Sequence, residues 1–335
     1  MRRILAIIAI LSVPAMAEAG TCLAATPSCA EWIAVGAARS LVYRSYPFDV
    51  PNHRITRALV LVHDTSRDAA AYFRTGVTTA ALAGALEETI VIAPRFASRN
   101  GVGCVDPLEP GEANWPCEGN SWRSGGFAAG STVTSFDLAD EILLKIARKT
   151  VFPNLRAIVV AGHSAGGQFV TRYQMANRVH DRLGIRVQYV VANPSSYAYP
   201  DTVRPVNDPG MSGKTAFGPF GERSCSSYDR WPYGLAARSG YSEKVSVAQL
   251  RQQLATRPAT YLLGGLDVLP VASFDESCAA MAQGPTRLAR GRAFAAYVNG
   301  QLRARHTVTI VPDCGHDARC MFTAKPALHA LFPRL

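Results

Sequence analysis

The sequence predicts an α/β fold in which a mainly parallel central sheet is flanked by helices. Short apolar segments rich in β-branched residues alternate with longer segments that carry apolar residues near helical spacing. The apolar segments end in polar or glycine residues, which is typical of strands buried in a parallel sheet. The chain has 335 residues, of which 48% are hydrophobic and 18% charged, a composition typical of a folded protein with a sizeable core.

Six segments are expected to form the strands of this sheet, because each is a short run of Val, Ile and Leu between polar residues. They span residues 57–64, 89–96, 156–164, 186–196, 259–267 and 306–316. The helices expected between them span residues 68–88, 131–149, 165–183 and 276–302. The second of these helices shows the pattern well, since one side of it carries Leu138, Ile142, Leu143 and Ile146.

Two irregular segments, 100–130 and 197–257, interrupt the alternation. The first is rich in glycine, proline, cysteine and tryptophan, and the second is long and polar with proline and tyrosine. Long irregular segments inside compact domains are commonly functional loops or lids. Because the chain has no internal repeat and no proline- or serine-rich linker, we expect one domain over residues 18–335 with these segments as lid-like insertions.

The first residues have the pattern of a secretory signal peptide. Two arginines precede an apolar run over residues 4–13, and small residues follow it. We expect a signal peptide over residues 1–17 with cleavage after Ala17, or after Ala19 in a second register. An uncleaved anchor helix is the alternative, but the run is short for a membrane span, and no later run approaches the roughly 20 apolar residues needed. The mature protein is therefore expected to be secreted or periplasmic, without a membrane span.

Export changes how the eight cysteines are interpreted, because oxidising compartments favour disulfides over free thiols. Eight cysteines allow on the order of a hundred connectivities, so the sequence alone does not decide the pairing. None of the cysteines has the CxxC spacing of a zinc ribbon or a thioredoxin site, which favours structural disulfides. Pairing of sequence neighbours would use all of them: Cys22 with Cys29, Cys104 with Cys117, Cys225 with Cys278 and Cys314 with Cys320.

The charge distribution gives little support to nucleic-acid binding. The net charge is +10, but the positive charges are scattered as single arginines, and no Lys/Arg run carries interleaved aromatic residues. A basic surface favours anionic polymers or a negatively charged cell envelope, and a merely solvated basic surface explains the same composition. The sequence gives no indication of the oligomeric state.

The stretch AIVVAGHSAGGQFV, which begins at Ala157, carries the strongest chemical signal. An apolar strand runs directly into the pattern GxSxG around Ser164 and then into a helix. A serine at such a sharp turn projects its hydroxyl from the sheet, and the flanking glycines let the backbone pass without Cβ clashes. The start of the helix supplies N–H groups where negative charge develops during acyl transfer. An ordinary strand-to-helix turn is the alternative, but the context favours Ser164 as a nucleophile.

A serine hydroxyl is a weak nucleophile until a base accepts its proton, so the chain must also supply a histidine and an acid. In hydrolases with this turn the acid and then the histidine follow the serine, each after a strand. Asp267 comes directly after one apolar run and His316 directly after the last one, which makes them the predicted acid and base. Less favoured acids, too close in sequence to this histidine or past the expected turn, are Asp275, Asp313 and Asp317.

Further residues are expected to complete the site. The backbone N–H of Ala165 and that of Thr65, in the loop after an early strand, are the candidate donors to an oxyanion. His63 and His163 are expected to line the site, whereas His53, His180, His306 and His329 are expected to be ordinary surface residues. Aromatic residues of the two insertions would stack on a substrate or pack the loops themselves; they are Trp115, Trp122, Tyr197, Tyr199, Tyr228, Trp231 and Tyr233.

Four stretches resemble the α/β-hydrolase superfamily, and the resemblance covers about residues 41–331. LVHDTSRDAAAYF, GHSAGGQFVTRY, VVANPSSYAYPD and YLLGGLDVLP are similar to secreted esterases of the polyhydroxybutyrate depolymerase and feruloyl esterase group. The resemblance implies an α/β-hydrolase fold, a triad of Ser164, Asp267 and His316, and oxyanion donors at Thr65 and Ala165. The family usually has His-Gly after the early strand, whereas here Asp64 takes the place of the glycine.

The activity that this resemblance implies is hydrolysis of a small-molecule or polymeric carboxylic ester through an acyl-enzyme, without a metal or an organic cofactor. Two alternatives stay open. One is a serine peptidase or an acyltransferase that uses the same triad, and the other is a non-catalytic secreted binding protein built on a hydrolase scaffold.

Overall fold

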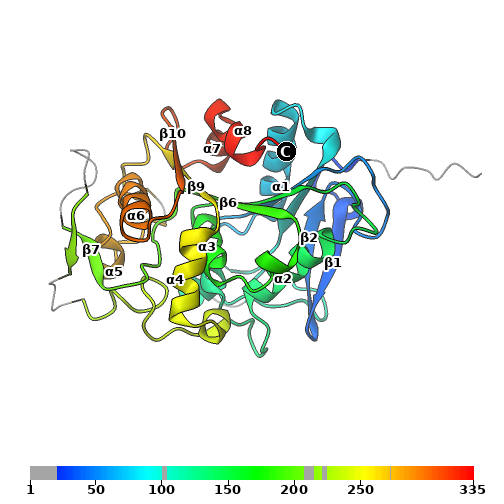
Figure 1. The fold of residues 1–335 in the computed structure, drawn as a ribbon. Coiled ribbons are helices and arrows are strands. Elements are labelled where there is room, and N and C mark those ends of the chain that lie inside the picture. The colour runs from blue at the N-terminus through cyan, green and yellow to red at the C-terminus, as the bar shows by residue number, and fades with distance from the viewer. Residues whose placement is uncertain (1–20, 100–103, 207–214, 221–224, 272) are drawn as a thin grey trace, which may run out of the picture.

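The computed structural model describes residues 21–99, 104–206, 215–220, 225–271 and 273–335. The expected signal peptide, residues 1–17, lies outside the described residues. In the described part a single large sheet runs through the middle of the molecule with helices on both faces (Figure 1). The predicted α/β fold class is therefore confirmed.

The central sheet has eight strands in the order β1-β2-β4-β3-β5-β6-β9-β10. Neighbouring strands from β4 to β10 pair in parallel, and β2 pairs antiparallel with β1 and β4. All six expected strands are present, and the β1–β2 hairpin was not expected. The strands are β1 (Ala30–Val35), β2 (Ala38–Arg44), β3 (Arg57–Val62), β4 (Thr89–Pro94), β5 (Ala157–His163), β6 (Arg186–Ala192), β9 (Ala259–Gly264) and β10 (Thr307–Val311).

Two short strands, β7 (Val203–Pro205) and β8 (Phe217–Pro219), form a separate antiparallel pair. The α-helices are α1 (Ala69–Leu82), α2 (Ser135–Ile146), α3 (Ala165–Ala176), α4 (Val247–Thr256), α5 (Cys278–Met281), α6 (Arg287–Gln301), α7 (Ala318–Thr323) and α8 (Lys325–Leu331). Short 3-10 helices are η1 (Pro27–Cys29), η2 (Leu86–Glu88), η3 (Glu118–Ser124), η4 (His180–Arg182) and η5 (Gly240–Lys244).

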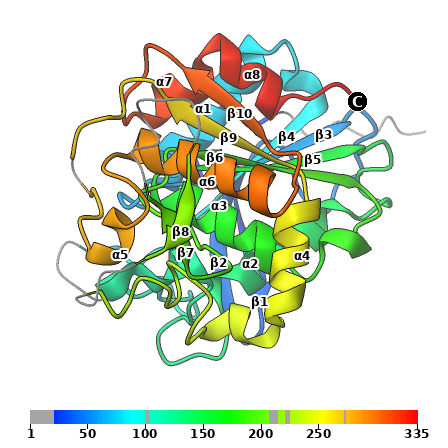
Figure 2. The same cartoon turned by 60° about the vertical axis from the view of Figure 1, so that its left-hand side comes forward.

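The helices form two layers that each bury one face of the sheet. Helices α1, α7 and α8 cover one face, and α2, α3 and α4 cover the other (Figures 1 and 2). Strand β3 shows the alternation that this requires: Leu59 and Leu61 pack with the first layer, and Val60 and Val62 pack with the second. Because both faces are covered, the central strands are apolar at almost every position.

Three predicted segment boundaries are corrected. The helix expected at 276–302 is two helices, α5 and α6, because Gly284, with φ +138°, and the following proline break it. The helix expected at 68–88 ends at Leu82, shortly before Gly84 with φ +65°. The insertion expected at 197–257 is not irregular to its end, since its last part forms η5 and α4.

The predicted pairing of cysteines is confirmed for all four disulfides: Cys22–Cys29, Cys104–Cys117, Cys225–Cys278 and Cys314–Cys320. The third joins the second insertion to α5, and the fourth encloses His316 in a short loop. Among the residues that the structure describes, no helix combines the length and the apolar character needed to cross a membrane.

Candidate active site

Ser164 lies in a sterically demanding turn between β5 and α3. Its backbone has φ 56° and ψ −117°, a conformation that is costly for any residue with a side chain. The glycines on either side are required by space: a Cβ on Gly162 would lie 2.3 Å from the carbonyl oxygen of Gly166, and one on Gly166 would lie 2.2 Å from that of Val62. The sequence GxSxG thus folds into a tight elbow with the serine at its tip.

The structure brings Ser164, His316 and Asp267 together in one hydrogen-bonded chain. Ser164 Oγ lies 2.9 Å from His316 Nε2, and His316 Nδ1 lies 2.8 Å from Asp267 Oδ2. Ser164 follows β5, Asp267 follows β9 and His316 follows β10, so all three lie at the carboxyl edge of parallel strands. Ser164 and Asp267 are buried, and the His316 side chain keeps 11% of its exposure.

Asn193 holds the two loops that carry the acid and the histidine, and sequence reasoning missed it. It follows β6, the strand between β5 and β9, and has φ 44°. Its Oδ1 accepts a hydrogen bond from the N–H of Gly264 at 2.8 Å, and its Nδ2 donates to the carbonyl of Gly315 at 3.0 Å. The signal was an asparagine directly after a buried strand, since asparagine tolerates this left-handed backbone better than most residues.

The two expected oxyanion donors lie at adjacent strand ends. Ala165 is the first residue of α3, and Thr65 belongs to the connection between β3 and α1. These segments touch, because a Cβ on Gly166 would lie within 2.6 Å of the His63 carbonyl oxygen. Thr65 Oγ1 also lies 3.1 Å from Ser273 Oγ, which joins this connection to the loop after β9. The β3–α1 connection therefore begins beside the serine elbow.

His63 fixes the loop that carries Thr65. Its Nδ1 donates to the carbonyl of Asp64 at 2.8 Å, and its Nε2 accepts from the N–H of Phe96 at 3.1 Å. Burial lowers the pKa of His63 to about 4, so the ring is neutral and can serve as donor at one nitrogen and acceptor at the other.

Asp64 fits this loop without a left-handed backbone. Among the described residues with positive φ, this loop contributes Arg67, at φ 59°, and not Asp64. The Asp64 carboxylate accepts from the N–H of Ser66 at 2.8 Å, which closes a local turn. The guanidinium of Arg67 donates to the carbonyls of Phe96 at 2.6 Å and Trp115 at 2.9 Å and so anchors the loop to the first insertion.

The residues named for substrate contact have side chains that are buried in this structure; they are His63, His163, Trp122 and Tyr197. Trp122 stacks on Phe96 at 5.0 Å between ring centroids, and Tyr197 stacks on Phe294 at 4.4 Å. Trp115 and Tyr199 are buried as well, whereas Tyr228, Trp231 and Tyr233 are partly exposed. The insertions thus use their aromatic side chains mainly to pack themselves onto the sheet.

Two buried histidines, His163 and His306, pack against other rings. His163 packs against the His316 ring with 4.6 Å between centroids, and burial lowers the pKa of His163 well below its usual range. A neutral ring therefore supports the histidine of the hydrogen-bonded chain. His306 was expected at the surface but is buried, and its Nδ1 lies 2.9 Å from the hydroxyl of Tyr261.

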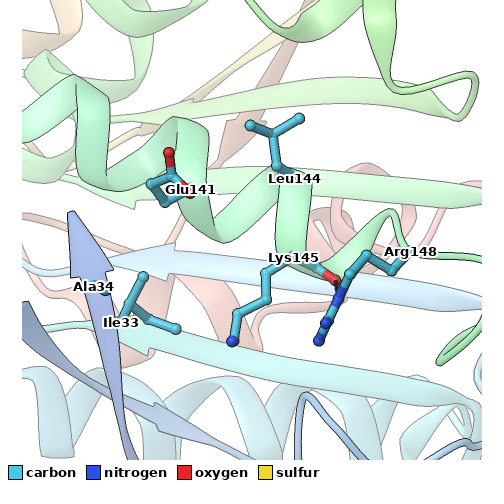
Figure 3. A pocket seen from close by; sticks show the side chains of 6 residues that line it. All are labelled: Ile33, Ala34, Glu141, Leu144, Lys145 and Arg148. Atoms are coloured by element: carbon cyan, nitrogen blue, oxygen red, sulfur yellow. Dashed lines mark hydrogen bonds between the residues drawn. The ribbon is translucent and has the colours of Figure 1, made fainter. Parts of the chain in front are cut away.

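A cavity of about 320 Å³ has His316 in its wall and lies between the β3–α1 connection and α7. Charged side chains line it together with His316; they are Asp64, Asp68, Asp317, Arg74 and Arg319. A second pocket of about 290 Å³ lies between β1 and α2, where Lys145 and Arg148 extend beside Ile33 (Figure 3). Because β1 is the edge strand farthest from β10, the second pocket is not part of the serine site.

The described residues contain no group of three or more histidine, cysteine or carboxylate side chains that could hold a metal ion.

A serine at a strained elbow, followed along parallel strands by its acid and its histidine, defines the class of serine hydrolase sites built on α/β sheets. Residues 59–328 match the sequence pattern of the Alpha/beta hydrolase family, so the chain belongs to this family. No curated protein sequence matches the chain significantly.

Two solved structures share the fold. LpqC, a poly(3-hydroxybutyrate) depolymerase from Bordetella parapertussis, is 21% identical with a TM-score of 0.61, over 89% of this chain and 88% of that one. Poly(aspartic acid) hydrolase-1 from Sphingomonas sp. KT-1 is 22% identical with a TM-score of 0.56, over 87% of this chain and 95% of that one. At this identity the similarity establishes the fold, and the expected resemblance is confirmed at the level of the superfamily.

Proposed function

We propose that this protein is an exported serine hydrolase that cleaves carboxylic esters through Ser164, His316 and Asp267. Membership of the α/β hydrolase family supports a hydrolase. The observation that carries the proposal is the hydrogen-bonded chain from Ser164 through His316 to Asp267, with the serine held in a strained elbow. The four disulfides support an oxidising compartment and hence export.

The proposed reaction has two steps. His316 Nε2 accepts the proton of Ser164 as Oγ bonds to the ester carbonyl carbon, and the carbonyl electrons move to its oxygen. Asp267 orients the imidazole and stabilises its charged form, and the N–H groups of Ala165 and Thr65 bind the oxyanion. The C–O bond to the alcohol then breaks, and the alcohol takes the proton from His316. Water, deprotonated by His316, attacks the acyl-enzyme, and the proton returns to Ser164 as the acid leaves.

The cavity beside His316 is the proposed place for the alcohol part of the ester, because the leaving oxygen must receive its proton from His316.

Two proteins with the same fold are named for polymer substrates, a polyester and a polyamide, which supports testing polymers beside small substrates. The proposal favours esters and needs no metal or organic cofactor. Peptidase and acyltransferase activities on the same residues are the alternatives that an assay must distinguish.

Covalent labelling with a fluorophosphonate tests the proposal. The wild-type protein should be labelled and should hydrolyse an activated ester faster than the matching amide. Ser164→Ala should abolish the label, and His316→Gln and Asp267→Asn should each lower kcat by about 10⁴-fold while the thermal transition is retained. Ser239→Ala, which changes an exposed serine outside the site, is the control. Absence of labelling in the folded wild type, or undiminished turnover in Ser164→Ala, would reject the proposal.

A further inference from the structure

The two oxygens of Asp267 have different partners. Oδ2 contacts His316, whereas Oδ1 has no hydrogen bond among the described residues and lies 3.5 Å from Nη1 of Arg287. Both side chains of this ion pair have an exposure of 0%. A carboxylate removed from water is strongly destabilised unless a cation or hydrogen-bond donors compensate it. Arg287 supplies the positive charge on the side of Asp267 that faces away from His316.

Arg287 is itself held firmly. Its Nε donates to Ser195 Oγ at 2.8 Å, and its guanidinium lies 5.0 Å from the ring centroid of Phe274. The next residue, Leu288, donates its backbone N–H to the carbonyl of Asp267 at 3.3 Å. The start of α6 and the loop of the acid are therefore joined through both the main chain and the side chain, which limits their relative movement.

The position of Arg287 is electrostatically unfavourable for the helix that carries it. Arg287 is the first residue of α6 and Arg290 is the fourth, and both are buried. The N-terminal end of a helix carries a partial positive charge, so cations there are destabilising, and burial adds a desolvation cost. Arg290 donates to three backbone groups, the carbonyls of Ser195, Asp275 and Gly284. The Asp267 carboxylate lies 3.5 Å from Arg287, so this ion pair brings the charge of the helix start to the triad acid.

We propose that Arg287 is a positioning residue for Asp267: the ion pair holds the carboxylate through Oδ1 and aims Oδ2 at His316, and it raises the rate of acyl transfer without touching substrate. This inference rests on the proposed function, because it takes Asp267 as the triad acid. Small displacements of a catalytic group cost about 100-fold in rate, which sets the size of the expected effect.

The test compares Arg287→Met with Arg290→Met on a soluble activated ester. Arg287→Met should lower kcat by about 100-fold and leave KM within about twofold, because Arg287 contacts the acid and not the substrate. Arg287→Lys, which keeps the charge but loses the planar fork, should recover about tenfold of the loss. Arg290→Met removes an equally buried arginine from the same helical turn and should lower thermal stability while kcat stays within about threefold of wild type.

A double-mutant cycle separates positioning from general destabilisation. In an Asp267→Asn background, Arg287→Met should change the rate of fluorophosphonate labelling by less than about twofold. Arg287 acts on His316 through the Asp267 carboxylate, which this background lacks. An equal loss in both backgrounds, or a wild-type kcat in folded Arg287→Met, overturns the inference. If the Met variant does not fold, wild-type kcat in Arg287→Lys overturns it instead. Turnover that survives Ser164→Ala would instead overturn the proposed function, so the two failures are distinguishable.

Discussion

Asp140 on α2 is a buried carboxyl whose ionisation should destabilise the protein as the pH rises. It accepts hydrogen bonds from the hydroxyls of Tyr173 at 2.7 Å and Tyr241 at 2.5 Å. Burial raises the pKa of Asp140 from 3.8 to about 6, and the two hydroxyls and nearby Arg178 offset only part of this effect. Tyr241 belongs to the second insertion, so this carboxyl also fastens the insertion to α2 and α3.

The magnitude follows from the shift of about two pKa units. Each unit corresponds to about 1.4 kcal/mol, so the ionisation of Asp140 costs the folded state about 3 kcal/mol. Between about pH 4 and pH 6 the folded protein binds more protons at this site than the unfolded chain. The free energy of unfolding therefore decreases as the pH rises through this window, and the loss is complete above it. Asp140→Asn cannot ionise and escapes this loss.

Urea unfolding of wild type and Asp140→Asn at pH 4 and pH 7, at equal ionic strength, measures the effect. The free energy of unfolding of the variant minus that of wild type should increase by about 3 kcal/mol from pH 4 to pH 7. Other titrating groups cancel in this difference. Glu141→Gln, which changes an exposed carboxyl on the same helix, is the matched control. A relative stability that stays constant, or that changes in the opposite direction, would refute the reasoning.

Three further predictions concern the core and the active-site loop. Burial lowers the pKa of His306 to about 4, so the free energy of unfolding decreases as the pH falls from about 6.5 towards 4. In urea unfolding, His306→Gln should lose about 3 kcal/mol less of this free energy than wild type over that range. An equal loss in both proteins would contradict this. Trp122→Ala removes a fully buried indole and should lower the free energy of unfolding by about 3–5 kcal/mol. A loss under about 1 kcal/mol would mean that the indole is not packed as described. Replacing Cys314 and Cys320 by alanine should free the His316 loop and lower kcat about tenfold. Removal of the Cys22–Cys29 disulfide, the control, should leave kcat unchanged. Equal kcat values in the two variants would show that the Cys314–Cys320 cross-link does not hold the loop.

The sequence predicted those parts of the fold that depend on local pattern. The six central strands are covered on both faces, which makes them continuous apolar runs that are easy to recognise. The hairpin of β1 and β2 was missed because it lies at the sheet edge, where Glu31 and Ser40 interrupt the apolar pattern. The serine elbow was predictable because its glycines are required by close backbone contacts within a few residues.

The parts that were missed depend on contacts between distant segments. Trp122 and Tyr197 lie in segments without periodicity, and such segments give no indication of which side chains face the core. Asn193 acts through Gly264 and Gly315, far away along the chain. Arg287 was passed over because charged residues are seldom fully buried, and only the three-dimensional arrangement places it against Asp267.

The bridge made by Asn193 has a consequence for how this protein can change. Its side-chain amide joins Gly264, which leads into the loop of the acid, to Gly315 in the loop of the histidine, and neither of these partners belongs to an insertion. Substitutions in the two insertions therefore leave both of these hydrogen bonds in place. Laboratory evolution that confines mutations to the two insertions should alter selectivity more readily than it abolishes turnover.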